Sequence, residues 1–99
     1  MNEIRLTCGY YTVRLYRDAA NVLIPVRDVK NILGVRKHKL RKLIADIPYN
    51  HLVRIDQSSR VYINCVTLEG LHMIIESYSY KYPKAAGLLK KWIKSHIDC

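Results

Sequence analysis

The fold of this 99-residue chain is decided by residues 28–47, which read DVKNILGVRKHKLRKLIADI. Apolar side chains recur in the first part of this stretch at the spacing of one helix face, at Val29, Ile32 and Leu33. Asp28 can accept backbone N–H bonds at the start of a helix, and Gly34 suits a left-handed helix C-cap. We therefore predict a short helix that ends at Gly34 and is followed by a turn.

A second helix is expected directly after this turn, over residues 36–46. Its apolar residues fall at positions i, i+3, i+4 and i+7 and form one stripe, made of Leu40, Leu43, Ile44 and Ile47. Pro48 ends the helix, because proline cannot continue the backbone hydrogen bonding. The stripe would pack inward against the rest of the domain.

The outward face of this second helix is cationic. Residues 36–42 hold five basic side chains and one histidine, namely Arg36, Lys37, His38, Lys39, Arg41 and Lys42. At about 100° per residue, His38, Arg41 and Lys42 lie opposite the apolar stripe, together with the small Ala45. Solvated helix faces usually mix charges of both signs, whereas the one acid here is Asp46. The two helices thus have the arrangement of a helix-turn-helix DNA reader.

Two β-hairpins are predicted, one on either side of the helix pair. The first joins a strand over residues 10–17, rich in Tyr, Val and Leu, to a short strand over residues 22–24, through turn residues at 18–21. The second joins residues 52–55 to residues 61–63 across a polar loop.

Two further helices complete the pattern. Thr67 is a good N-cap for a helix over residues 68–79, which would bury Leu71, Ile74, Ile75 and Tyr78. The last helix, over residues 84–97, places on its apolar side Ala85, Leu88, Leu89, Trp92 and His96. Its other side carries lysines that form a second candidate surface for phosphate, namely Lys90, Lys91 and Lys94. The whole predicts an α+β fold, a small single domain with two β-hairpins and about four helices, whose core spans residues 10–97.

Composition agrees with one folded domain that attracts polyanions. The length suffices for one hydrophobic core and not for two, and 49% of the residues are hydrophobic. Basic residues number 17 against 8 acidic ones, which gives a formal net charge of +9. A charge of this size on so small a domain favours a polyanionic partner and would not be needed for a neutral small substrate.

No pattern in the sequence indicates catalysis, a metal or a cofactor. The three cysteines, Cys8, Cys65 and Cys99, are far apart and odd in number, which argues against a disulfide framework and for a reducing compartment. His96 and Cys99 have a ligand-like spacing, but two ligands do not make a zinc site. Paired carboxylates, a Ser-His-Asp order, a Gly-rich phosphate loop and an HExxH motif are all missing. We expect a protein that is not an enzyme, with no metal and no cofactor.

Two segments resemble a known family, the Bro-N domains of large DNA viruses and bacteriophages. Residues 23–35, LIPVRDVKNILGV, look like that family's strand leading into an Asp-Val-x-x-x-Leu-Gly helix. Residues 67–75, TLEGLHMII, and 83–93, PKAAGLLKKWI, are similar to its Gly-Leu helix and its final Ala-x-x-Phe-x-x-Trp helix. The chain has leucine where the family often has phenylalanine in that last motif, a change that a core tolerates. The resemblance covers about residues 11–97.

The resemblance implies a DNA-binding domain without enzymatic activity, often the N-terminal module of a viral regulatory protein. Our leading hypothesis is that the basic helix contacts phosphates, with His38 and Arg41 as candidates for base edges. RNA is a possible partner as well, and a homodimer is plausible because helix-turn-helix readers often pair. The alternative is a host-modulating adaptor that keeps the fold but no longer binds DNA. It would bind a host protein through the tyrosine-rich residues 78–82.

The chain is also expected to be intracellular. Its first residues, MNEIR, lack the basic start and apolar stretch of a secretory signal, and no segment approaches the roughly 20 apolar residues of a membrane span. We expect no membrane partner. If the protein is viral, its place would be the cytoplasm or nucleus of the host cell.

Overall fold

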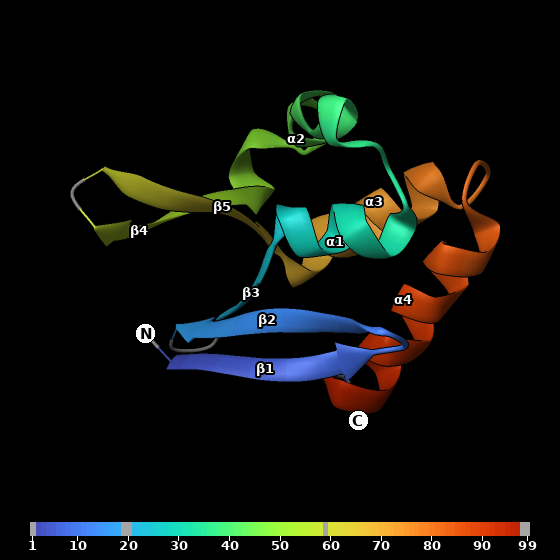
Figure 1. Ribbon diagram of the computed structural model, residues 1–99, viewed down its shortest axis with the longest axis horizontal. Helices are drawn as coiled ribbons and strands as arrows, with labels where there is room; N and C mark the ends of the chain where they lie inside the picture. Colours follow the sequence, from blue (N-terminus) through green and yellow to red (C-terminus); the bar gives the residue numbers. More distant parts are fainter. Residues whose placement is uncertain (1, 19–20, 59, 98–99) are drawn as a thin grey trace.

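The chain folds as an α+β domain, a five-stranded antiparallel sheet with helices packed on it (Figure 1). The computed structural model describes residues 2–18, 21–58 and 60–97. Its elements in chain order are β1 (Asn2–Cys8), β2 (Tyr11–Asp18), β3 (Asn21–Pro25), α1 (Val26–Leu33), the 3₁₀ turn η1 (Lys37–Lys39), α2 (Leu40–Asp46), the 3₁₀ turn η2 (Tyr49–His51), β4 (Leu52–Ser58), β5 (Val61–Thr67), α3 (Leu68–Tyr78) and α4 (Pro83–His96).

The sheet brings the N-terminal strands and the β4–β5 hairpin together, in the order β1-β2-β3-β5-β4. Short β3 stands at its centre, where it pairs with β2 on one side and places Ile24 opposite Val66 of β5 on the other. The two long hairpins, β1–β2 and β4–β5, diverge from this junction in Figure 1. The chain segment between β3 and β4 is the helix pair α1 and α2, so the sheet fixes both ends of the candidate DNA reader.

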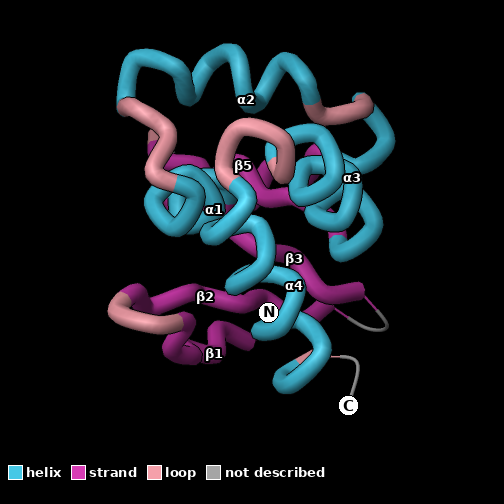
Figure 2. Tube along the Cα trace, turned by 90° about the vertical axis from the view of Figure 1, so that its right-hand side faces the viewer, coloured by secondary structure: helices cyan, strands magenta, loops and turns pink. Residues whose placement is uncertain are grey.

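One main hydrophobic core is shared by the sheet and the four α-helices. Figure 2 shows α1, α2 and α3 on one side of the β1–β2 hairpin, with α4 running past them towards it. The core takes residues from the sheet and from each α-helix, among them Leu15, Ile24, Val66, Val29, Leu43, Leu71, Leu89 and Ile93, all at most 2% exposed. Burying large aliphatic side chains contributes roughly 1.5–3 kcal/mol each, and this contribution holds the short helices in place.

Both predicted hairpins, the helix after Thr67 and the last helix are confirmed. The Thr67 hydroxyl accepts a hydrogen bond from the Gly70 backbone N–H at 3.1 Å, as an N-cap should. Gly34 has a φ of 80°, which confirms the left-handed C-cap of α1. Of the predicted turn at 18–21, residues 19 and 20 lie outside the described residues, as does Cys99.

Residues 2–8 form strand β1, which was not among the predicted strands. This strand lies at the edge of the sheet and pairs only with β2, through a turn at Gly9 and Tyr10 in which Gly9 has a φ of 62°. Charged residues alternate with apolar ones along it, as in Glu3, Ile4 and Arg5, which is the period of a strand with one buried face.

Asp28 was predicted as a helix N-cap, and this was wrong. Helix α1 begins two residues earlier, at Val26, and Asp28 lies in its first turn with 8% of its surface exposed. Its carboxylate accepts the Arg14 backbone N–H at 2.9 Å and pairs with the Arg14 guanidinium at 3.5 Å. Because β3 pairs only with residues 16–18 of β2, that N–H has no strand partner, and Asp28 supplies the missing acceptor.

The predicted inner face of α4 was also partly wrong. The buried residues are Ala86, Leu89, Trp92 and Ile93, while Leu88 is 38% exposed and His96 is exposed. Compared with the prediction, the buried face of α4 is rotated so that it includes Ile93. The reason is that α4 packs against three elements at once, α1, α3 and β1. His96 instead stacks on Trp92, with ring centroids 5.6 Å apart.

No helix in the described part of the chain is long and apolar enough to cross a membrane.

Candidate nucleic-acid interface

The turn after α1 sets the direction of the basic segment. The Gly34 N–H donates to the Lys30 carbonyl at 3.0 Å, and the Val35 N–H donates to the same carbonyl at 3.1 Å. Together with the positive φ of Gly34, these bonds close the end of α1 and bring Val35 into the core, where 6% of it is exposed. The chain then leaves in an extended conformation at Arg36 and turns into η1.

The predicted helix over residues 36–46 is in fact two pieces. Residues Lys37–Lys39 form a 3₁₀ turn, Lys39 departs from helical geometry at φ −95° and ψ 0°, and the α-helix begins at Leu40. Neither piece has a side-chain N-cap, and RKHK contains no Ser, Thr, Asp or Asn that could cap a longer helix. Helix α2 is thus about 10 Å long, at 1.5 Å per residue.

The apolar stripe of α2 does face inward as predicted. Leu43 is fully buried and Ile47 is 5% exposed, whereas Leu40 and Ile44 are half-buried at the edge of the core. Ala45 is exposed on the opposite side. The helix is therefore fixed by one central anchor, Leu43, and its outer face is free to meet a partner.

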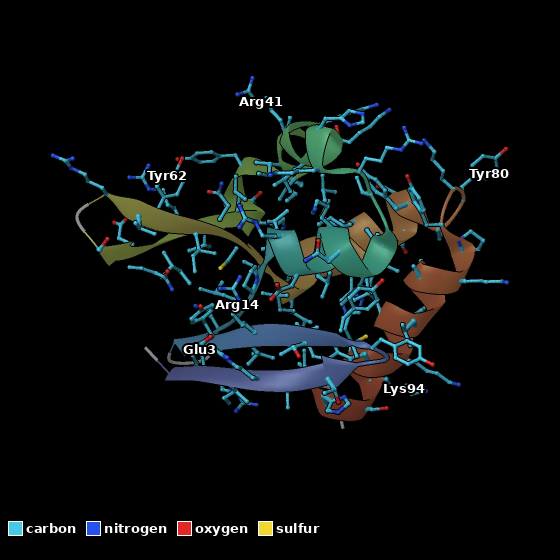
Figure 3. The ribbon with its side chains drawn as sticks, in the orientation of Figure 1. Glu3, Arg14, Arg41, Tyr62, Tyr80 and Lys94 are labelled. Atoms are coloured by element: carbon cyan, nitrogen blue, oxygen red, sulfur yellow. The ribbon has the colours of Figure 1, made fainter. Side chains whose placement is uncertain are left out.

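All six predicted side chains of this segment are exposed, namely Arg36, Lys37, His38, Lys39, Arg41 and Lys42, which we call the α2 surface. Among the described residues, no ion pair involves any of them. Asp46, the acid of the same helix, instead accepts a hydrogen bond from the Tyr78 hydroxyl at 3.3 Å. Burial, and then the Asp46 carboxylate, raise the pKa of Tyr78. The positive charge of the α2 surface is thus available to an external anion. Figure 3 shows Arg41 projecting from the top of the molecule.

On one side, the α2 surface continues across a groove of about 230 Å³ to the turn between α3 and α4. We call it the turn groove, and three of its lining residues are the lysines Lys39, Lys42 and Lys81. Lys81 was not among the predicted binding residues. It lies in the break between two helices, and its ammonium group is 5.8 Å from the centre of the Tyr82 ring, which itself stacks on Tyr78. The sequence places Lys81 far from α2, so only the packing of α2 beside the α3–α4 turn reveals it.

On the other side, a larger groove of about 430 Å³ separates α2 from the β4–β5 hairpin. We call it the hairpin groove. Leu40 and Ile44 line it from α2, and Tyr62 and Asn64 line it from β5. This groove explains why Leu40 and Ile44 are only half-buried, although they belong to the apolar stripe.

The lysines of α4 form a separate surface. Lys90, Lys91 and Lys94 are exposed, as predicted, but α4 packs on α1, α3 and β1. In Figure 3, Lys94 projects from the lower right, at the far end of the molecule from Arg41. The structure therefore does not bring the two predicted groups of cations together on one face.

Three residues of the types found in a hydrolase triad lie close together, although no motif in the sequence predicted this. The His51 Nδ1 lies 3.0 Å from the Thr67 hydroxyl, and its Nε2 lies 3.9 Å from the Glu69 carboxylate. The Thr67 oxygen, however, is the N-cap of α3 and already accepts the Gly70 N–H. His51 thus braces a helix cap, and no groove described above reaches this cluster.

The two described cysteines are buried, and their thiols are poor nucleophiles. Cys8 is 2% exposed and Cys65 is fully buried, and both carry free thiols. Burial raises the pKa of Cys65 to about 11 and also raises that of Cys8. A thiol is a nucleophile only as the thiolate, so these side chains act as small apolar groups of the core.

Comparison of the chain with models of protein families, with curated proteins and with solved structures gives no match in any of the three. Function is therefore argued from the site itself.

Proposed function

We propose that this protein is a non-catalytic DNA-binding domain that contacts the phosphate backbone and a groove of DNA through the α2 surface. The observation that carries the proposal is the set of six exposed basic or imidazole side chains with no ion-pair partner among the described residues. Lysines serve as point charges for phosphate, and the forked donors of an arginine suit a guanine edge. The resemblance to Bro-N domains supports the same function and, with it, a role within a viral regulatory protein.

Each residue type on the α2 surface has a role in this proposal. Lys37, Lys39 and Lys42 bind phosphates, while Arg41 and His38 reach base edges. A two-turn helix is long enough to present such a small set of side chains to the major groove, and its anchor Leu43 fixes its orientation. Because Lys81 stands across the turn groove from Lys42, the same backbone can continue to it.

The test is a salt titration of duplex DNA binding, followed by fluorescence anisotropy. If the four lysines Lys37, Lys39, Lys42 and Lys81 contact phosphate, the logarithm of the affinity should fall against the logarithm of salt concentration with a slope of about −4. The double variant Arg41→Glu/Lys42→Glu should bind at least about tenfold more weakly, with a shallower slope, because two contacts are lost and two repulsions gained.

A matched control separates a local site from a mere effect of net charge. The variant Lys90→Glu/Lys94→Glu changes the net charge by the same amount, from +9 to +5, on the surface of α4. If the α2 surface is the site, this control loses clearly less affinity. Equal losses in both variants would mean that diffuse charge binds DNA, and a salt-independent affinity would contradict the proposal altogether.

A second candidate function is an adaptor that binds a host protein through the α3–α4 turn. The observation in its favour is Tyr80, which is 97% exposed at that turn (Figure 3). Exposed tyrosines are common anchors of protein interfaces. Its test is partner capture in cells. Capture that survives Arg41→Glu/Lys42→Glu and is lost in Tyr80→Ala, in a protein that binds no nucleic acid, would favour the adaptor.

A further inference from the structure

The hairpin groove is larger than the turn groove, and it lies directly beside the α2 surface. Its volume of about 430 Å³ falls in the range of sites that bind small ligands, about 300–1,000 Å³. One wall is the half-buried edge of α2, Leu40 and Ile44, and Val26 of α1 adds a further apolar group. Any polymer bound to the α2 surface therefore passes next to this opening.

The lining of the hairpin groove combines three kinds of group that a nucleotide needs. Tyr62 offers an aromatic ring for stacking, and Gln57 and Asn64 offer amide donors and acceptors that match the edge of a base. Arg27 supplies positive charge, Arg14 supplies guanidinium donors although it pairs with Asp28, and the groove lining itself includes no carboxylate. A simple phosphate site would need neither the ring nor the apolar wall.

Two of these side chains are held in position before any ligand arrives. The Arg54 guanidinium lies over the Tyr62 ring, 4.2 Å from its centre, and Tyr62 as a residue is still 51% exposed. Arg14 is fixed by the buried Asp28 carboxylate, at 3.5 Å from its Nε. Pre-positioned groups bind a ligand at a lower cost in conformational entropy.

We infer that the hairpin groove holds the base of an unpaired nucleotide whose strand is bound by the α2 surface. This inference rests on the proposed function, because the backbone must first be held by α2. Inside a duplex, a base is stacked and paired, so it reaches the groove only from a single strand or after it is turned out of the helix. The base stacks on Tyr62, and Asn64 and Gln57 bond to its edge. The shared ligand is an unpaired nucleotide, of DNA or of RNA.

The test compares a duplex, a duplex with a central unpaired bubble, single-stranded DNA and single-stranded RNA of equal length, each with one 2-aminopurine base. The bubble and at least one single strand should bind about tenfold or more tightly than the duplex, with a change in 2-aminopurine fluorescence. The two single strands show whether the nucleotide comes from DNA or RNA. Tyr62→Ala should remove this preference, with a loss of roughly 5- to 150-fold for the unpaired ligands and little change for the duplex.

Control variants separate stacking from folding. Tyr62→Phe keeps the ring and should keep the preference, and Tyr10→Ala removes a fully exposed tyrosine from the β1–β2 turn and should change nothing. Equal affinity for paired and unpaired ligands, unaffected by Tyr62→Ala, would overturn this inference while leaving duplex binding by α2 intact. No binding to any of the four ligands would overturn the proposed function and the inference together.

Discussion

Gly70 gives a sharp prediction about stability, because replacing it with alanine should destabilise the protein although alanine is the better helix former. Gly70 lies in the first turn of α3 and is buried. An added Cβ would stand 2.5 Å from Cγ2 of Val66 and 2.8 Å from Cβ of His51. Val66 is a fully buried, β-branched residue of the sheet, and the His51 Cβ is attached directly to the backbone, so neither atom can move aside by a rotamer change alone.

The magnitude follows from three opposing effects. Overpacking of a buried site costs typically about 1–3 kcal/mol. The same Cβ would lie 3.3 Å from the Thr67 hydroxyl that caps α3, and a lost cap costs about 1 kcal/mol. Against these stands a gain of roughly 0.5–1 kcal/mol from replacing glycine by alanine in a helix. The net effect is a loss of about 1–3 kcal/mol, or a fall in Tm of roughly 5–20 °C for a domain of this size.

Gly87 supplies the matched control. It lies exposed within α4, and a Cβ added there meets no atom within 4 Å. Gly87→Ala should therefore raise the free energy of unfolding by about 0.4–1 kcal/mol. Both variants would be followed by thermal and urea unfolding. Two variants that are stabilised alike would refute the packing of α3 against Val66 and His51 described above.

Three further predictions concern the core and its polar contacts. Leu43→Ala should lower the free energy of unfolding by about 2–5 kcal/mol in urea titrations, because it empties the fully buried anchor of α2. Asp28→Ala should cost about 2–3 kcal/mol and Asp28→Asn less, because only the asparagine keeps an acceptor for the Arg14 N–H. The raised pKa of Cys65, about 11, predicts negligible alkylation of this residue in the native protein at pH 8, read by peptide mass spectrometry. Since the unfolded thiol ionises first, near pH 9, the contribution of Cys65 to stability should be retained below that pH and fall by up to about 2 kcal/mol as pH rises to 11, and Cys65→Ala should make the loss of stability smaller by this amount.

The sequence was sufficient where local patterns and the tertiary fold agree. The spacing of Leu40, Leu43, Ile44 and Ile47 predicted which side of α2 faces the core, and Thr67 predicted the start of α3. In both cases one rule, helical periodicity or side-chain capping, decides the outcome within a single element. The exposure of Arg41 and Lys42 followed from the same periodicity, whereas residues 36–39 are exposed in an extended segment and a 3₁₀ turn.

The sequence was insufficient to predict the role of a residue whose contacts are made with residues far away in the chain. Asp28 has the sequence context of an N-cap, yet it bonds to Arg14, 14 residues earlier, because a strand of the sheet is left without a neighbour there. Lys81 belongs to the candidate interface only through the packing of the α3–α4 turn beside α2. No periodicity encodes such contacts, since they depend on how elements dock.

The half-buried positions of α2 connect its stability with its proposed role. A helix of seven residues has little stability of its own, so its place depends on Leu43 and Ile47, while Leu40 and Ile44 give up part of their burial to the hairpin groove. A folded domain selected for stability alone would close that groove with a larger side chain from β5. The chain instead has Asn64 there, a polar residue that is half-buried and faces the groove. Replacing Asn64 with leucine should therefore raise the free energy of unfolding in urea and weaken binding of an unpaired nucleotide. A variant that gains stability and still binds the unpaired nucleotide as tightly would show that the groove does not have the function proposed for it.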